Sequence, residues 1–299
     1  MTRQVRIRKS PGDTIFGIVV YTLLTLIGIA VLYPLIYVFS ASFSSSEQVI
    51  SGRVWLWPVG FTTYAYEQVF ANQQIISGYL NTIFYAVTGT IVSLSLTVLA
   101  AYSLSRKRLV GYGVLTKMFL FSTLFSGGLI PFYLVVRGTG LLYTRAAVVI
   151  PVALNFFHIV LMRTHIQSSI PEELFEAAEI DGCSHLGKLI RIVLPLSGSI
   201  LAVLVLYNIV GQWNSYFYAM IFLKDSAKYP LQIILRDILI NNSMSADMSF
   251  NMEEILVKQG LRDVLKYALI VVSSFPLLII YPFVQKYFVK GVMMGSLKG

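Results

Sequence analysis

Charged residues are scarce in this sequence, and that scarcity argues against a soluble protein. Only 12% of the 299 residues are Asp, Glu, Lys or Arg, whereas soluble domains carry about 25%. The hydrophobic fraction is 56%, and the mean hydropathy is +0.73. Few charges together with long apolar runs predict a polytopic membrane protein.

Cysteine and histidine are also rare, which excludes several kinds of site. The single cysteine, Cys183, cannot form an intrachain disulfide or a metal site built from thiolates. The three histidines have neither HExxH spacing nor a clustered acidic partner. No Ser/His/Asp or paired-carboxylate arrangement is recognisable, so we expect neither an enzyme nor a metal protein.

A phosphate-binding loop of the G-x4-G-K-[ST] type is absent as well. Any energy from nucleotide hydrolysis must therefore come from another polypeptide. The net charge of +9 would suggest nucleic acid in a soluble protein. No basic stripe with interleaved aromatic residues accompanies it, so we expect cationic loops facing anionic lipid and no nucleic-acid partner.

Apolar runs recur along the chain and predict an all-α membrane protein with six transmembrane helices. The six runs cover residues 14–39, 78–104, 117–136, 142–161, 194–223 and 267–283. The first follows a basic segment, as a signal peptide would. A signal peptide has an apolar region of about 7–15 residues, however, and this run is close to the full span of about 20. We therefore predict a retained first helix.

These runs divide the chain into a transmembrane domain, 14–288, between two tails, 1–13 and 289–299. The predicted external loops are 41–77 and 224–266, and the predicted internal loop is 168–192. With both termini inside, 14 Lys and Arg residues lie inside and nine outside, six of these nine in one long loop. Because positive charge concentrates in short cytoplasmic loops, we expect both termini and loop 168–192 to face the cytoplasm.

Residues 168–192, called the EAA segment below, form the most concentrated polar stretch in the second half of the chain. Ser169 and Glu172 match a capping box, and Pro171 suits the first turn of a helix. We predict a short helix from about Pro171, a reversal at Gly182 and a second helix over 184–192. Leu174, Ala177, Ala178 and Asp181 would then share one face of the first helix. This pattern favours a helix–turn–helix that presents small residues to another protein.

The order of residues here resembles the EAA loop of the permeases of bacterial ABC importers. The matching pattern is E-A-A-x-x-D-G-x9-I-x-L-P, from Glu176 to Pro195. Two positions depart from it: Cys183 stands where the family usually has Ala, and Leu189-Ile190 replace a common aromatic residue. An ordinary amphipathic connector between membrane helices is the simpler alternative.

The resemblance implies a six-helix type I importer permease whose EAA helix docks on a cytoplasmic ATPase. The residues implied in that coupling are Glu176, Ala177, Ala178, Asp181, Gly182 and Pro195. The implied partners are a second, paralogous permease, two ATPase subunits and an extracytoplasmic solute-binding protein. ATP and Mg would be bound by the ATPase and no cofactor by this chain. The implied location is the bacterial cytoplasmic (inner) membrane, with alternating access as the mechanism.

A polar, aromatic motif interrupts the fifth apolar run. Its candidate substrate-path residues are Gln212, Trp213, Asn214, Tyr216 and Tyr218. Polar side chains in hydrocarbon are costly, so the amides should face the bundle interior or a water-filled path. Aromatic faces beside amides suit sugars, and the motif is similar to that of carbohydrate-type permeases. Packing at the membrane boundary is the open alternative.

Other segments are similar to permeases for complex, uronate-rich oligosaccharides such as alginate or pectin fragments. They are 41–45, 54–58 and 229–239. Segment 129–134 is similar to carbohydrate-importer permeases in general, and the K-G tail at 298–299 resembles that of the second permease of maltose-type importers. Ser126-Gly127-Gly128 and Pro131 fall within the third run, as a hinge or a close-packing point. A secondary transporter and a membrane-embedded enzyme remain as alternatives, but neither mid-membrane ionisable groups nor an inverted repeat is evident.

Overall fold

The computed structural model describes residues 10–106, 109–244 and 252–296. These residues form helices and connecting loops and contain no strand, which confirms the all-α class. The chain divides into two compact units, with unit 1 formed by 1–71 and 241–274 and unit 2 by 72–240 and 275–299. The long helix α15, Met252–Ser296, contributes to both.

Unit 1 is built on α1, which covers Pro11–Ser42 and contains the first predicted span. Ser10 caps it: the Ser10 backbone N–H donates to Asp13 Oδ2 at 3.0 Å, and Pro11 occupies the first helical position. Up to Phe39 its apolar side chains are mostly exposed within the chain. A helix that is apolar on all sides is typical of a membrane span facing lipid or another subunit.

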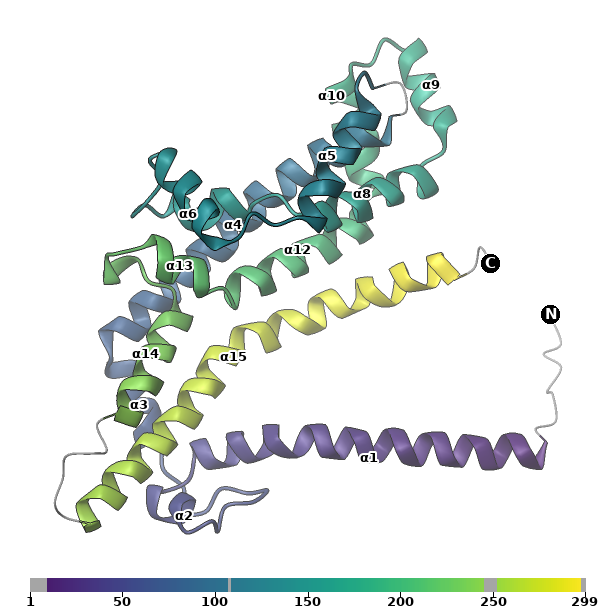
Figure 1. Cartoon of the computed structure of the whole chain (residues 1–299). Coiled ribbons are helices and arrows are strands. Elements are labelled where there is room, and N and C mark those ends of the chain that lie inside the picture. The colour runs from purple at the N-terminus through teal and green to yellow at the C-terminus, as the bar shows by residue number, and fades with distance from the viewer. Residues whose placement is uncertain (1–9, 107–108, 245–251, 297–299) are drawn as a thin grey trace. The chain divides into compact units, whose positions relative to one another are not determined.

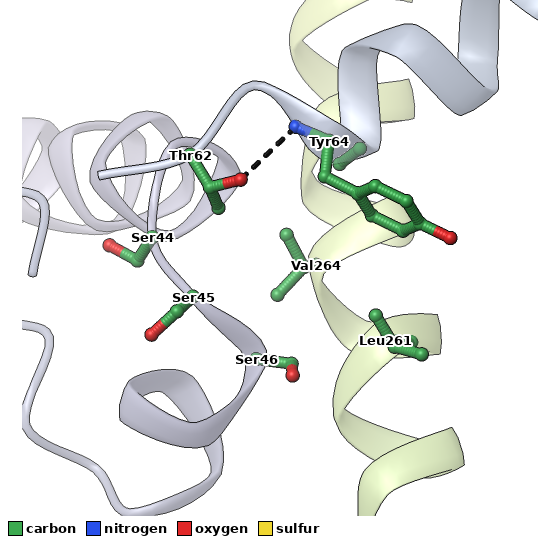
Figure 2. Close-up of a pocket in the computed structure, with 8 residues that line it drawn as sticks. Ser44, Ser45, Ser46, Thr62, Tyr64, Leu261 and Val264 are labelled. Atoms are coloured by element: carbon green, nitrogen blue, oxygen red, sulfur yellow. Dashed lines mark hydrogen bonds between the residues drawn. The ribbon is translucent and has the colours of Figure 1, made fainter. Parts of the chain in front are cut away.

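The predicted external loop 41–77 is partly helical. It contains α2, Ser46–Ile50, and α3, Tyr64–Ala71, and α4 begins within it at Gln73. Buried hydroxyls hold the loop to the end of α1, since Ser40 Oγ donates to the Leu56 carbonyl and Ser44 Oγ accepts from the Val59 N–H. A shallow pocket of about 200 Å³ lies here (Figure 2), where the Tyr64 N–H donates to Thr62 Oγ1. Its lining is Ser44, Ser45, Ser46, Thr62, Tyr64, Ala65, Leu261 and Val264.

Unit 2 is organised around α4, Gln73–Ser105, a continuous helix without proline. It packs along its length against α12, Gly198–Trp213, and α8, Phe156–Ser169 (Figure 1). The remaining helices described in unit 2, apart from those of the EAA segment, are α5 (Tyr112–Leu124), α6 (Leu129–Gly138), α7 (Ala146–Val149), η1 (Ile150–Val152), α13 (Phe217–Phe222), η3 (Ser226–Lys228) and α14 (Leu231–Met244).

Three apolar runs predicted as continuous spans are broken. The third is divided into α5 and α6, because Gly128 has a φ of 85° and the glycine pair lies between the helices and not within one. The fourth bends by 52° between η1 and α8, where Asn155 caps α8 by accepting from the Phe157 N–H. The fifth bends by 85° at Ser197 and ends at Trp213, before α13.

By length and composition, three described helices are able to cross a membrane, and five segments are if each bent pair counts as one. The three are α1, α4 and residues 261–282 of α15. The predicted long loop 224–266 is largely helical, and α15 runs through the sixth predicted span to Ser296 in the predicted tail. The basic residues of the first nine positions, Lys107, Arg108 and the K-G tail lie outside the described residues.

Candidate functional site

The first helix of the EAA segment is α9, Glu172–Ile180. The helix begins close to the predicted position, and Pro171 is its N-cap residue. The predicted capping box is wrong, because Ser169 is the last residue of α8 and no side chain caps α9. Ser169 is used differently: its hydroxyl lies 3.4 Å from His165 Nδ1, one turn earlier in α8.

The reversal after α9 lies at Gly182, as predicted. Its φ of 71° is in the left-handed region, which glycine adopts without steric penalty. Ser184 then caps α10, His185–Lys188, by accepting from the Gly187 N–H at 3.1 Å. The second helix does not stop at 192: it continues through η2, a π-helical stretch over Leu189–Val193, into α11, Leu194–Leu196, which contains Pro195.

Most of the face predicted to meet another protein is exposed within the chain, and a different side of α9 is buried. Phe175 and Ala178 are buried, whereas Leu174 and Ala177 are exposed. Phe175 is only 3% exposed and belongs to the apolar core shared by α4, α8 and α12. The large aromatic side chain therefore decides which side of this helix faces the bundle, because it removes more apolar area from water than alanine does.

Five of the six predicted coupling residues are exposed. They are Glu176, Ala177, Asp181, Gly182 and Pro195, whereas Ala178 is buried. The same segment also carries a set of exposed apolar side chains, called the apolar rim below. Its members are Leu174, Ile180, Leu186 and Ile190, of which Ile180 is 88% exposed. Apolar side chains left exposed in a polar segment are available for contact with another protein.

Arg106, directly after α4, attaches α9 to that helix. Its Nη1 lies 2.9 Å from Glu172 Oε1, and its guanidinium carbon lies 3.4 Å from the ring centre of Phe175. The same guanidinium is 5.4 Å from the ring centre of Tyr102 in α4. A planar cation between two aromatic rings and a carboxylate is a geometry that arginine makes and lysine does not.

A second ion pair holds the two helices of the EAA segment together. Lys188 Nζ lies 2.6 Å from Glu179 Oε1, and the lysine side chain is only 3% exposed. The Cys183 N–H also donates to the Ala178 carbonyl at 2.8 Å, closing the turn. A buried ammonium is costly without a partner, so this pair fixes the angle between α9 and α10.

The candidate substrate-path residues lie at the break between α12 and α13. Gln212 is half-buried against Gly89 of α4: a Cβ added at Gly89 would come within 2.8 Å of its Nε2. Trp213 is 3% exposed, and its ring lies 5.9 Å from that of Tyr79, also in α4. Asn214 is exposed, and its Nδ2 donates to the Val210 carbonyl.

The two tyrosines of this set, Tyr216 and Tyr218, have different surroundings from Gln212 and Trp213. Tyr216 is exposed at the start of α13. Tyr218 packs edge-on to Phe132 of α6, with ring centres 5.5 Å apart, and stacks on Phe222. The structure therefore brings Gln212 and Trp213 together on α4 and places Tyr218 in a separate aromatic cluster.

Arg106, Phe175 and Gly89 were not singled out from the sequence. Arg106 entered the sequence analysis only through the count of Lys and Arg residues, and Phe175 lies between acidic residues that drew attention away from it. A usable signal was present for Phe175, since one large apolar residue in an acidic helix predicts the buried side. Among the described residues, no group of three or more His, Cys, Asp or Glu is placed to hold a metal ion.

Comparison with known proteins gives the same picture. The family of binding-protein-dependent transport system inner membrane components matches residues 93–294. The polygalacturonan/rhamnogalacturonan transport system permease protein YtcP of Bacillus subtilis (strain 168) is 41% identical over 288 residues, covering 96% of this chain and 99% of YtcP. Protein LplC of the same organism is 38% identical and covers 91% of each chain.

A solved structure is similar over nearly the whole chain. It is described as a bacterial ABC transporter involved in the import of the acidic polysaccharide alginate. The matched chain is 39% identical, with a TM-score of 0.85, covering 94% of this chain and 99% of that one. The helical fold, the exposed EAA segment and these matches lead to one assignment: the chain belongs to the family of binding-protein-dependent transport system inner membrane components, the permease subunits of ABC importers.

Proposed function

We propose that this permease carries acidic, uronate-containing oligosaccharides from a binding protein into the cytoplasm. The observation that carries the substrate class is the pair of relatives near 40% identity over almost the full chain. The name of one specifies polygalacturonan and rhamnogalacturonan, and the description of the other specifies alginate. All three are polymers with uronate units, so an acidic oligosaccharide is the substrate common to both.

A permease of this family works with a second permease, an ATPase and a binding protein. For this chain we propose a heterodimer with a paralogous permease and two ATPase subunits, which bind the ATP and Mg. Its place is the inner membrane, with both termini and the EAA segment on the cytoplasmic side. The excess of Lys and Arg in the short loops on that side supports this orientation.

The EAA segment is the proposed docking site for the ATPase. The exposed apolar rim supports it, because an apolar surface on an aqueous loop is stabilised by burial against a partner. Glu176, Ala177, Asp181 and Gly182 are exposed in the same segment and are the proposed contacts. ATP-driven closure of the ATPases would move this segment and switch the helices between inward-open and outward-open states.

The substrate path is proposed to pass the break between α12 and α13. Gln212 and Asn214 offer amide groups to sugar hydroxyls, and Tyr216 offers an exposed aromatic face. A helix that ends within an apolar region leaves backbone groups free of helical bonds, and in transporters such ends line a cavity. Trp213 and Tyr218 then support the wall of the path from behind.

The test is uptake by the complete importer in proteoliposomes. Oligogalacturonate or alginate fragments, delivered by the cognate binding protein, should be taken up with ATP, whereas neutral maltooligosaccharides should not. Glu176→Lys and Gly182→Pro should abolish uptake while the protein still inserts, since proline cannot take the positive φ at 182. Uptake of neutral sugars alone would overturn the substrate class, and normal uptake by both variants would overturn the docking site.

A further inference from the structure

We propose that Arg106 makes α4 a second lever of the coupling movement, so that the EAA segment acts on Gln212 and Trp213 through α4. The inference rests on the proposed docking of the EAA segment on an ATPase. The covalent route to the candidate substrate path runs from the segment through α11 and α12. The route through Arg106 is separate and is formed by side-chain contacts alone.

The first step is the attachment of α9 to α4. Arg106 forms its ion pair with Glu172 at 2.9 Å and lies over the rings of Phe175 and Tyr102. The arginine side chain is 21% exposed, so its contacts are only partly screened by water. Gln167 adds a hydrogen bond from α8, donating to the Ser105 carbonyl at 3.2 Å. A displacement of α9 therefore pulls on the end of α4.

The second step is transmission along α4. The helix has no proline and no break between Gly89 and Ser105. At about 1.5 Å per residue this stretch is about 24 Å long. It is packed on α8 and α12 (Figure 1), and close-packed interiors transmit displacement.

The third step is contact with the candidate substrate path. Gly89 lets the backbone of α4 approach Gln212, whose side chain fills the place of the missing Cβ. About three turns earlier in α4, Tyr79 meets the ring of Trp213 edge-on, at 5.9 Å between ring centres. One helix thus contacts the EAA segment near one end and both of these residues farther along.

Arg106 is accordingly a positioning residue, and its test separates transport from ATP hydrolysis. The complete importer in proteoliposomes is assayed for sugar taken up per ATP hydrolysed. Arg106→Gln should lower this ratio about tenfold, within the range of allosteric coupling, with ATP hydrolysis changed by less than about twofold. Arg106→Lys keeps the charge opposite Glu172 and should recover part of the ratio. Arg137→Gln, an exposed arginine at the end of α6, is the matched control and should leave the ratio unchanged.

A double variant tests the route itself. If Arg106 acts through α4 on Gln212, Arg106→Gln combined with Gln212→Ala should lower the ratio no further than the stronger single variant. Multiplying effects would overturn the route, and so would an unchanged ratio in Arg106→Gln. Loss of the ATPase subunits from purified Arg106→Gln importer would also overturn it, since Arg106 would then only shape the docking surface. A failure of the proposed function is distinguishable from all of these outcomes, because the unmodified importer would then not take up acidic oligosaccharides.

Discussion

The two ends of α4 hold distant segments by different chemistry. Near its end, Arg106 holds the EAA segment through a carboxylate and two aromatic rings. Near its beginning, α4 holds the segment 225–231 through neutral hydrogen bonds. Asn81 Nδ2 donates to the carbonyls of Ala227 and Tyr229, at 2.8 and 3.1 Å, and Tyr85 donates to the Lys228 carbonyl at 2.8 Å.

The two ends of α4 differ in how strongly their interactions depend on distance and angle. Hydrogen bonds between a buried amide and fixed carbonyls weaken steeply once distance and angle change, so that end suits a permanent clamp. An arginine on aromatic faces keeps much of its attraction while the rings slide, because the electrostatic part changes slowly with distance. We infer that the Asn81 end of α4 anchors a loop, whereas the Arg106 end stays attached to the EAA segment while both move.

The largest effect on assembly is expected in the EAA segment, at the Arg106 end of α4. Ile180→Glu places a charge in the apolar rim, on the side chain that is 88% exposed. Burying an unpaired carboxylate against a partner is unfavourable, so association with the ATPase should weaken at least about tenfold. Ile180→Met keeps the surface apolar and should retain association, measured by co-purification. Equal retention in both variants would show that the rim is not the docking surface.

A substitution at the Asn81 end of α4 should lower the stability of the importer and leave the amount of sugar transported per ATP unchanged. Asn81→Leu leaves two carbonyls without their donor and Arg145 Nη2 without its acceptor at 3.0 Å. We expect a loss of about 2–4 kcal/mol, read as a lower thermal midpoint of the purified importer. Thr88→Val removes only a hydrogen bond within α4 and is the control. If Asn81→Leu had a normal thermal midpoint but took up less sugar per ATP, the Asn81 end of α4 would serve coupling and not stability, contrary to the comparison above.

Within the EAA segment, the buried ion pair should show an asymmetry between its partners. Glu179→Gln leaves the Lys188 ammonium, 3% exposed, without its carboxylate and should cost about 2 kcal/mol, because Glu179 itself is half-exposed and screened. Lys188→Met removes the ammonium and keeps an apolar stem, so it should cost less. Thermal midpoints of the two variants decide the order, and a larger loss in Lys188→Met would contradict it.

The smallest effect on stability is expected from the charge of Asp225, in the segment held by the Asn81 end of α4. The Ala227 N–H donates to Asp225 Oδ1, and this bond, with Lys228 nearby, lowers the pKa of the Asp225 carboxyl. A lowered folded-state pKa stabilises the fold above the unfolded-state value of about 3.9, and the gain is lost as pH falls through the lower value. Asp225→Asn should thus melt slightly below the unmodified importer at neutral pH and match it in acid. A gap that widens in acid would be inconsistent with this pKa.

Local rules predicted much of the EAA segment. The helix beginning after Pro171, the reversal at Gly182 and the exposure of Glu176 and Asp181 all follow from residue type and spacing. The contact of Phe175 with the bundle was not predicted, because the sequence analysis assigned the small-residue face to a partner protein and no residue of α9 to the core. Burial is decided by the apolar area available on the neighbouring helices, which spacing along one helix does not contain.

All six predicted apolar runs are largely helical in the structure, but three of them are not continuous helices. Hydropathy reports composition over a window and is insensitive to one residue with a positive φ or one helix cap. Gly128 and Asn155 each end or begin a helix inside such a window. The assignment of Gln212, Trp213, Asn214, Tyr216 and Tyr218 to a substrate path stays a prediction.

Composition and order of residues determined the class of this protein: few charges, long apolar runs and the pattern from Glu176 to Pro195 suffice for a helical importer permease. Only the tertiary structure decided that Arg106 lies against Phe175 and Glu172, and that Gly89 lies under Gln212. These residues are separated by more than sixty positions, and their contact depends on how α4 packs against α8 and α12. Such packing follows from the fit of many side chains at once, which no local pattern expresses.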